Sequence, residues 1–257
     1  MIHLKSPRDI ATMHEGGKIL AKILGKLSEA VRPGIATQEL EKLARELVLS
    51  YKVKPAFLGY GGYPAVLCAS VSDEVVHGEP SARELKESET VSLDMGIIYD
   101  GFYLDSAVTV PVLGAMGMSH WIKSNPELNR LLEVTKEALG AGIKEACIGN
   151  RVGNIGYAIQ KVIEGHGLGV VRELVGHGIG RSLHEEPQIP NYGKKTDGAE
   201  IKEGMVLAIE PMVTLGEWKV KKDRNSSAYL TADRSPAAHF EHTVAVTQDG
   251  PLVLTIA

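Results

Sequence analysis

The sequence is poor in cysteine and aromatic residues and contains no long apolar run. Its two cysteines, Cys68 and Cys147, form no CxxC pair, which excludes a zinc knuckle and a redox dithiol. No apolar segment approaches the roughly 18–20 residues that span a bilayer, and the N-terminus lacks the pattern of a signal peptide. We therefore expect a cytoplasmic protein with reduced thiols and no membrane partner.

The charge is close to balanced. There are 28 basic and 32 acidic residues, for a formal charge of −4, and the 44% apolar content is typical of globular proteins. This balance gives no electrostatic reason to expect binding to DNA. The basic run from Lys219 to Arg224 has no interleaved aromatic residues, so we interpret it as part of a solvated polar loop over residues 219–235.

Four segments have the apolar spacing of helices. The first begins at the capping signal Ser6-Pro7 and ends before Pro33, and the second begins at Thr37. The third follows Pro126, and the fourth starts near Val152 and ends at the glycines 165 and 167. Two helix pairs are therefore expected, one in each half of the chain.

Strand patterns fall between and after these helix pairs. They cover residues 65–71, a hairpin over residues 91–110, and two further strands at residues 205–213 and 239–246. A helix pair followed by sheet thus occurs twice, over residues 1–115 and 120–257. The pattern predicts an α+β fold in which two similar halves surround one curved antiparallel sheet.

The hairpin carries two acids in an apolar context. With Asp100-Gly101 as its turn, the residue numbers of cross-strand partners sum to 201, so Asp94 lies opposite Ala107. Asp105 then shares a face with Asp94, about 7–8 Å away at the backbone. Unpaired carboxylates among apolar neighbours cost several kcal/mol or become protonated, so we expect a positive group between them.

Similar anomalies occur in the second half. Glu210 and Glu241 lie in otherwise apolar strands, and His177 is framed by glycines. Together with the hairpin acids they favour a binuclear divalent-metal site with oxygen-rich ligation and one nitrogen. The sequence has no HExxH, GxSxG or P-loop motif, so activated water is the expected nucleophile.

Taken in order, these residues and their flanks resemble a methionine aminopeptidase of the short bacterial type I. The resemblance extends over nearly the whole chain, and it rests on the metal-site residues and on the segments 59–64, 76–80, 100–102, 176–180, 184–187, 209–212 and 241–243. It implies the pita-bread fold and a single catalytic domain over residues 1–257. It also implies removal of the initiator methionine, by attack of a metal-bound hydroxide on the first peptide bond and with preference for a small second residue.

The resemblance implies a role for each site residue. Asp105 and Glu241 correspond to carboxylates that bridge two metal ions, which would be Mn, Fe, Co or Zn. Asp94 corresponds to a ligand of the second ion, while His177 and Glu210 complete the first. Glu210 also takes the proton of the bridging water. The remaining roles are contact with the substrate amide, by His77 and His184, and a methionine pocket, formed by Phe57, Tyr60, Tyr63, Cys68 and Leu183.

Several positions depart from the family pattern. Ser227 stands where the family has a tryptophan, for which Trp218 is a candidate replacement, and His239 stands where a glutamine is usual. Leu183 replaces an aromatic residue, Gly61 replaces a histidine, and the segment 114–126 is longer than usual. Of the other histidines, His242 is expected to hydrogen-bond behind the metal ligands, and the rest are expected to be structural or exposed: His3, His14, His120 and His166.

The sequence leaves two other functions open. One is an Xaa-Pro aminopeptidase or prolidase, which shares the fold and the ligand order, and the other is a non-catalytic peptide-binding relative. For the favoured function the expected partners are the N-termini of nascent polypeptides, met at the ribosome by a monomeric enzyme.

Overall fold

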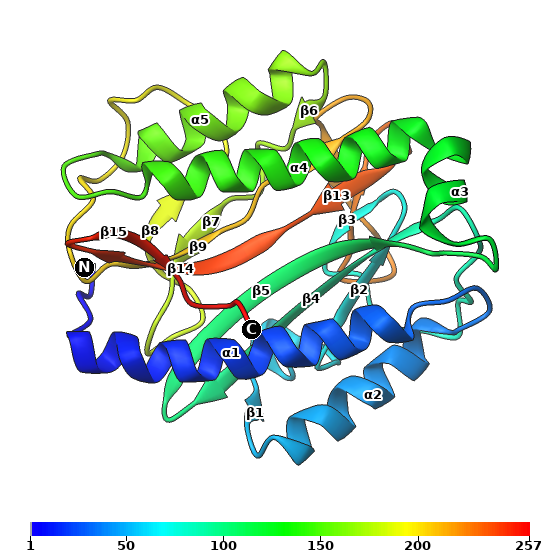
Figure 1. The fold of residues 1–257 in the computed structure, drawn as a ribbon, viewed down its shortest axis with the longest axis horizontal. Helices are drawn as coiled ribbons and strands as arrows, with labels where there is room; N and C mark the ends of the chain where they lie inside the picture. The colour runs from blue at the N-terminus through cyan, green and yellow to red at the C-terminus, as the bar shows by residue number, and fades with distance from the viewer. Residues whose placement is uncertain (1) are drawn as a thin grey trace.

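The computed structural model describes residues 2–257 and places two helix pairs against a curled sheet. In Figure 1, α1 (Pro7–Ala30) and α4 (Pro126–Glu145) cross the same side of the sheet, one over each half. The helix α2 (Thr37–Ser50) accompanies α1, and α5 (Val152–Gly165) accompanies α4. The predicted α+β class and both helix pairs are confirmed.

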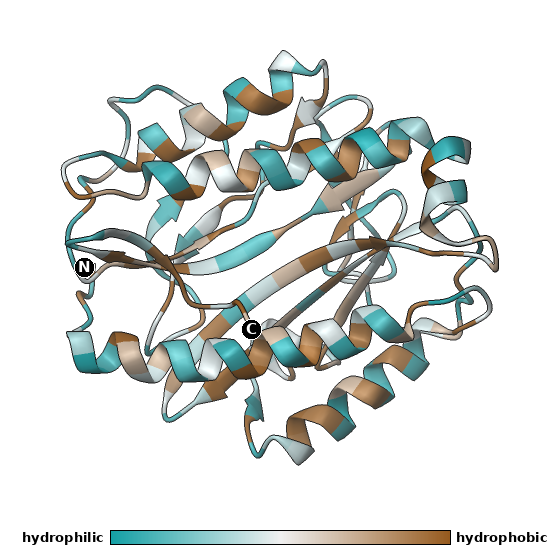
Figure 2. Cartoon of the chain, viewed as in Figure 1, coloured by the Kyte–Doolittle hydropathy of each residue, from teal (hydrophilic) through white to brown (hydrophobic). Residues whose placement is uncertain are grey.

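The start of α1 shows why these helices begin where the sequence places them. The Ser6 hydroxyl accepts a hydrogen bond from the Asp9 amide, and the Asp9 carboxylate accepts one from the Ser6 amide. Pro7 fills the first helical position, where no amide donor is needed. Figure 2 shows apolar and polar residues alternating around the long helices, and the buried apolar ones pack on the strands beneath.

The central hairpin has the predicted register. In β4 (Thr90–Tyr99) and β5 (Phe102–Pro111), Asp94 pairs with Ala107 and Asp105 pairs with Gly96. Asp94 and Asp105 therefore lie on one face of the sheet, as the two-residue side-chain period requires.

Within residues 2–257, the main sheet has nine strands, and all of its pairings are antiparallel. Its order is β1-β4-β5-β14-β9-β7-β8, with β2 on β4 and β15 on β14. The halves join where β5 pairs with β14, which sets Glu241 opposite Ala107. The bounds of these further strands are β1 Lys54–Pro55, β2 Cys68–Val71, β7 Gly176–Gly178, β8 Glu185–Ile189, β9 Val206–Ile209, β14 Glu241–Thr247 and β15 Gly250–Val253.

Two predicted strands are each divided in the structure. Residues 205–213 form β9 in the main sheet and then β10 (Met212–Thr214) in a small sheet, because Pro211 has no amide to continue the ladder. Residues 239–246 divide in the same way at Phe240, into β13 (Ala237–His239) and β14. The small sheet is completed by β6 (Gly169–Val170). Glu210 therefore stands at a break between two sheets.

The loop prediction for residues 219–235 was wrong. The segment contains β11 (Val220–Lys222) and β12 (Tyr229–Thr231), and β12 pairs with β3 (Glu74–Val76). Val220 and Tyr229 pack against a small core that includes Val75 and Val76. The segment is therefore ordered by contact with β3, a strand far from it in the sequence. Residues 114–126 contain an unpredicted helix, α3 (Gly117–Ser124). The predicted strand at residues 65–71 starts only at Cys68.

The apolar core lies on both sides of the junction between halves. One cluster gathers residues of α1, α2, β4 and β5, such as Leu20, Leu40 and Leu93. A second gathers residues of α4, α5 and β9, such as Leu131 and Ile159. None of the helices in residues 2–257 combines the length and apolar character that a membrane crossing requires.

Candidate active site

All of the side chains that the sequence analysis assigned to a site line one cavity of about 280 Å³. It also has four further lining residues, namely Gly61, Lys222, Ser227 and Tyr229. The twelve predicted residues in its wall are Phe57, Tyr60, Tyr63, Cys68, His77, Asp94, Asp105, His177, Leu183, His184, Glu210 and Glu241. The fold thus gathers them at one place, while the individual roles stay predictions.

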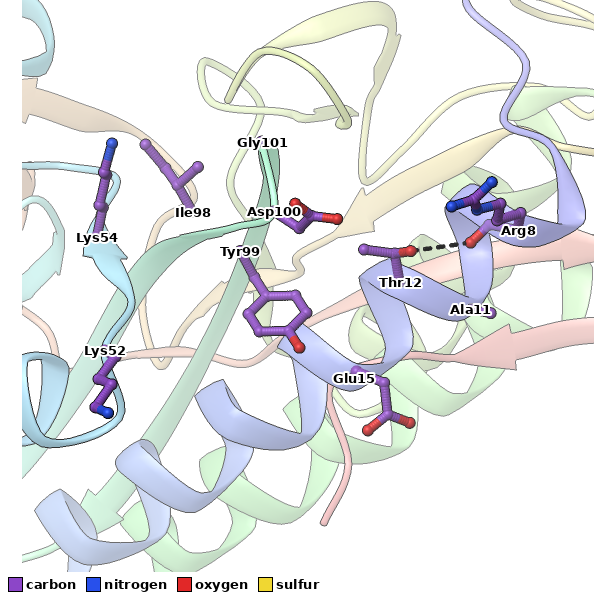
Figure 3. Close-up of a pocket in the computed structure, with 10 residues that line it drawn as sticks. All are labelled: Arg8, Ala11, Thr12, Glu15, Lys52, Lys54, Ile98, Tyr99, Asp100 and Gly101. Carbon is purple, nitrogen blue, oxygen red and sulfur yellow. Dashed lines mark hydrogen bonds between the residues drawn. The ribbon is translucent and has the colours of Figure 1, made fainter.

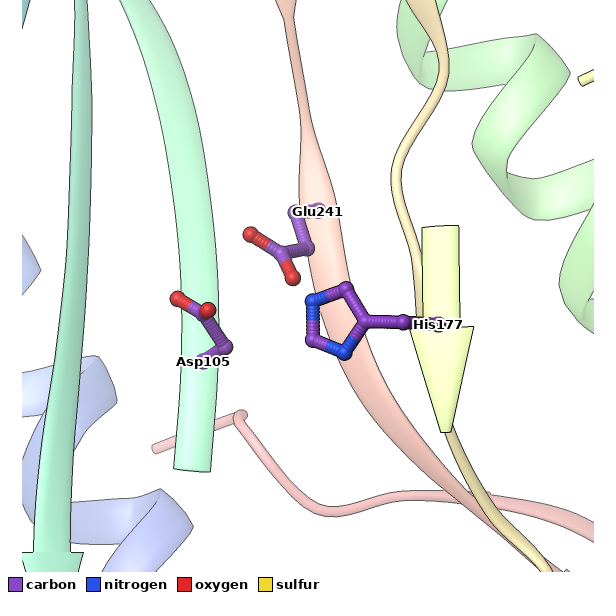
Figure 4. A group of neighbouring side chains, drawn as sticks. All are labelled: Asp105, His177 and Glu241. Atoms are coloured by element: carbon purple, nitrogen blue, oxygen red, sulfur yellow. The ribbon is translucent and has the colours of Figure 1, made fainter. Parts of the chain in front are cut away.

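Three of these groups have the mutual geometry of metal ligands. One ligand atom each of Asp105, His177 and Glu241 lies within 4.8 Å of the other two. Figure 4 shows the three side chains pointing toward one another from β5, β7 and β14. All three are buried. A single cation between them would contact all three side chains.

Asp94 and Glu210 adjoin this group from either side. Asp94 projects from β4 next to Asp105, and Glu210 follows β9 with its Oε1 atom 3.6 Å from Nε2 of His177. The strand order β4-β5-β14-β9-β7 means that five neighbouring strands each carry or directly precede one of the five groups. The regular pleat of the sheet therefore brings these five side chains together.

The buried carboxyl groups of the cluster would be stabilised by a cation among them. Burial, followed by the Glu210 carboxylate, raises the pKa of Asp105 to about 8, and burial raises that of Glu210 to about 8. Burial, followed by the Asp105 and Glu210 carboxylates, raises the pKa of Asp94 and of Glu241 well above their ordinary values. Within residues 2–257, Asp94 Oδ1, Asp105 Oδ1 and Glu241 Oε1 are buried without a hydrogen-bond partner. A divalent metal ion would supply the missing positive charge and the missing contacts.

The His177 ring is oriented so that one of its nitrogens faces the carboxylates. Its Nδ1–H donates to the carbonyl oxygen of Gly178 over 2.9 Å, which leaves the Nε2 lone pair free to face the carboxylates. Burial lowers the pKa of His177 to about 4, so the imidazole is neutral. This donor set of carboxylate oxygens and one imidazole fits a divalent transition metal.

Two more histidines reach the cavity. His77 follows β3 with a left-handed backbone, at φ 60°, and burial lowers its pKa to about 4. The ring of Tyr229 packs edge-on against His77, with centroids 5.9 Å apart. His184 packs against His177, with centroids 4.3 Å apart. Neutral imidazoles at these positions can donate one N–H each to a bound substrate.

The apolar wall of the cavity is built from several loops and strands. Phe57 packs closely on Gly96 of β4, where an added Cβ would come within 2.8 Å of the ring. Cys68 pairs opposite Asp94, and burial raises the pKa of its thiol. The Tyr63 hydroxyl lies within hydrogen-bonding distance of the carbonyl oxygens of Leu67 and Gly78 and can share its one proton between them, which fixes the ring.

The β11–β12 hairpin adds residues that the sequence analysis missed. It brings Lys222 and Tyr229 to the cavity because β12 pairs with the strand that leads into His77. Trp218, considered as a substitute aromatic wall, lies elsewhere and stacks on the guanidinium of Arg172. Ser227 is tied by its amide and hydroxyl to the Glu79 carboxylate, at 2.7 and 2.6 Å. In the sequence, the alternation of Tyr229-Leu230-Thr231 was the signal from which β12 could have been predicted.

The other histidines lie outside the cavity wall. His239 is buried on β13, behind Glu210. His242 is within hydrogen-bonding distance of the Thr255 hydroxyl at 2.9 Å. The remaining four are exposed or half-buried at the surface: His3, His14, His120 and His166.

A larger hollow lies away from the cluster. It measures about 780 Å³ and is open beside α1 and the tip of the β4–β5 hairpin. Figure 3 shows Arg8, Lys52, Lys54, Glu15 and Asp100 spread around it, with no convergence on one point. These are surface side chains without a buried acid among them, so chemistry is assigned to the smaller cavity.

Comparisons with known proteins find a matching family model and several similar proteins. The model of metallopeptidase family M24 matches residues 11–248. Methionine aminopeptidase from Clostridium acetobutylicum is 43% identical over 257 residues, covering 100% of this chain and 99% of its own, and methionine aminopeptidase 1 from Bacillus subtilis is 42% identical, covering 99% of each. The methionine aminopeptidase structure from Thermotoga maritima superposes with a TM-score of 0.94 at 41% identity, covering 100% of both chains.

A more distant structure shares the fold alone. The prolidase from Pyrococcus horikoshii has a TM-score of 0.77 at 21% identity, and the match covers 98% of this chain but 63% of the prolidase. The pita-bread expectation is therefore confirmed by both structural matches, and the methionine aminopeptidases are the more similar in sequence.

Proposed function

Because the chain belongs to metallopeptidase family M24, we propose that its cavity removes the N-terminal methionine from peptides and newly made proteins. The chain is a metal-dependent hydrolase of the aminopeptidase class. The observation that carries the proposal is the convergence of four buried carboxylates and one neutral histidine inside a cavity with an apolar wall. Residues 1–257 then act as one catalytic domain.

The metal site follows from the same cluster. Asp105 and Glu241, which project from the paired strands β5 and β14, would bridge two ions. Asp94 would complete one ion, and His177 with Glu210 the other. The ligand chemistry suits Mn, Fe, Co or Zn. When bound, these ions supply Lewis-acid activation of the attacking water and of the peptide carbonyl.

Proton transfer and stabilisation of the developing negative charge would be carried out by three side chains: Glu210, His77 and His184. Glu210 stands at the edge of the cluster, where a carboxylate oxygen can take the proton of the attacking water. His77 and His184 approach the cavity from the two halves of the chain. As neutral donors they would stabilise the oxygen of the first peptide carbonyl when negative charge develops on it.

Substrate selection rests on the apolar wall. Phe57, Tyr63, Cys68 and Leu183 offer an apolar lining that suits a flexible thioether side chain. The cavity is small, which favours a small second residue. The natural substrates would be N-termini of nascent chains, processed in the cytoplasm at the ribosome by a monomer.

Peptide hydrolysis tests the proposal directly. Chelator-treated protein is reloaded anaerobically with Mn, Fe, Co or Zn and given Met-Ala-Ser, Met-Leu-Ser and Ala-Pro-Ser. Release of methionine, chiefly from Met-Ala-Ser, is the expected result. Cleavage of Ala-Pro-Ser alone would assign the chain to proline-directed peptidases. Peptide binding without turnover, with metal bound, would make it a non-catalytic relative.

A further inference from the structure

A short contact links the two sides of the cavity. The Tyr60 hydroxyl oxygen lies 2.6 Å from Nδ1 of His184, although 124 positions separate the two residues. This distance is within the range for an O–H donor and shorter than the usual range for an N–H donor. A phenol O–H is also a stronger acid than the N–H of a neutral imidazole. The Tyr60 O–H therefore donates, and Nδ1 of His184 accepts.

Both partners are anchored by their surroundings. Tyr60 begins a tight turn in which its amide donates to the carbonyl of Phe57 and the Tyr63 amide donates back to the carbonyl of Tyr60. Gly59, before it, has φ 83°, a conformation that favours glycine. On the other side, Glu185 follows His184 and forms a buried ion pair with Lys5 over 2.5 Å. The contact thus joins two segments whose positions are fixed by other interactions, the turn at Tyr60 and the ion pair next to His184.

We propose that Tyr60 is a positioning residue that holds His184 in the tautomer with its proton on Nε2. With Nδ1 occupied as an acceptor, Nε2–H becomes the ring's donor toward a substrate in the cavity. The inference deepens the proposed function, on which the role of His184 rests. Tyr60 is 46% exposed, and its partial burial and the nearby Tyr103 raise the pKa of its phenol, so the hydroxyl keeps its proton at neutral pH.

Histidine tautomers can be measured without any activity assay. Protein labelled with ¹⁵N at histidine and loaded with diamagnetic Zn²⁺ is examined by long-range ¹H–¹⁵N correlation spectra. The His184 signals are identified by their loss in His184→Ala. In the unmodified protein we expect protonated Nε2 and unprotonated Nδ1. Tyr60→Phe keeps the ring and removes the donor, so the Nε2–H form should lose population. A proton on Nδ1 in the unmodified protein overturns the proposal.

Kinetics then test whether the tautomer matters. On Met-Ala-Ser, Tyr60→Phe should lower kcat about 3- to 10-fold with little change in KM, the effect of one lost hydrogen bond. In the His184→Ala background the same change should have no further effect, because Tyr60 acts through His184. Tyr157→Phe, an exposed tyrosine on α5, is the matched control.

The outcomes separate this inference from the proposed function. An unchanged tautomer and an unchanged kcat in Tyr60→Phe, or equal losses in both backgrounds, contradict the positioning role. If the unmodified protein releases no methionine, the proposed function fails, while the spectra still decide whether Tyr60 fixes the His184 tautomer.

Discussion

The Nε2 atom of His239 lies 3.4 Å from Oε2 of Glu210, whose other oxygen lies 3.6 Å from Nε2 of His177. Glu210 is thus flanked by two imidazoles. His239 is buried, its pKa is lowered to about 3 by burial, and within residues 2–257 its ring nitrogens have no hydrogen-bond partner. A neutral ring placed there can donate to Glu210 after a small shift and fix the orientation of that carboxylate.

This relationship predicts a graded response to substitution. His239→Leu removes the donor, and metal affinity should fall about 10- to 100-fold, as is usual when a group that orients a ligand is lost. His239→Gln retains a donor and should stay close to the unmodified protein. Calorimetric titration with Co²⁺ gives both values, with the exposed His166→Gln as control. Equal affinities for the leucine and glutamine variants would contradict the role.

Removing a bridging carboxylate should abolish turnover and yet stabilise the metal-free protein. Asp105→Asn and Glu241→Gln each delete a ligand charge, so hydrolysis of Met-Ala-Ser should fall at least about 1,000-fold. Each also removes a carboxyl group that is buried and must bind a proton to fold at neutral pH, so the Tm in chelator should rise. Asp249→Asn, in an exposed turn, is the control. A fully active Asp105→Asn enzyme would refute the assignment.

Stability of the metal-free protein should depend on pH in a defined sense. Between pH 6.5 and 8 the unfolded chain has ionised carboxylates, while folded Asp105 and Glu210, with a pKa of about 8, still bind protons. The folded state therefore binds more protons, and the free energy of unfolding falls as pH rises.

Below pH 6.5 the buried histidines oppose this trend. His77 and His177, with a pKa of about 4, are neutral when folded and protonated when unfolded, so they favour folding as pH rises. Asp94 and Glu241, whose pKa values are raised as well, balance the histidines, so the Tm in chelator should change little between pH 5 and 6.5 and then fall by at least about 5 °C by pH 8. Zn²⁺ should reverse that fall. Scanning calorimetry across this range, with and without Zn²⁺, checks the prediction, and a Tm that rises steadily to pH 8 in chelator would contradict it.

Local patterns were sufficient where the decisive contacts are close in sequence. Asp100-Gly101 set the hairpin register, and the two-residue period then placed Asp94 beside Asp105. Contacts between residues far apart in the sequence had no such local signal. The hairpin that carries Lys222 and Tyr229 is held in place by pairing with β3, about 150 positions earlier in the sequence. The Tyr60–His184 hydrogen bond likewise joins the two halves of the chain. Pro211 did carry a local signal for the strand break, because it cannot continue a ladder.

Lys222 gives the cavity an exposed positive charge at its wall. No ion-pair partner for its ammonium group occurs within residues 2–257, and the charge reaches far enough to help lower the pKa of His77. A substrate with an acidic residue after the scissile bond should therefore bind better than one with a basic residue. For an exposed pair the preference is expected to be about 2- to 5-fold at low salt.

Lys222→Glu should reverse this preference, and Lys222→Gln should remove it. Initial rates on Met-Ala-Asp and Met-Ala-Lys peptides measure the effect as a change in KM, since the charge acts on binding rather than on bond cleavage. At 1 M salt the Debye length shrinks to about 3 Å, and the difference between the two peptides should vanish. Lys221→Gln is the matched control, because its ammonium group donates to the carbonyl of Ala232, and it does not line the cavity. Equal rates on both peptides at low salt would place Lys222 outside the path of the substrate.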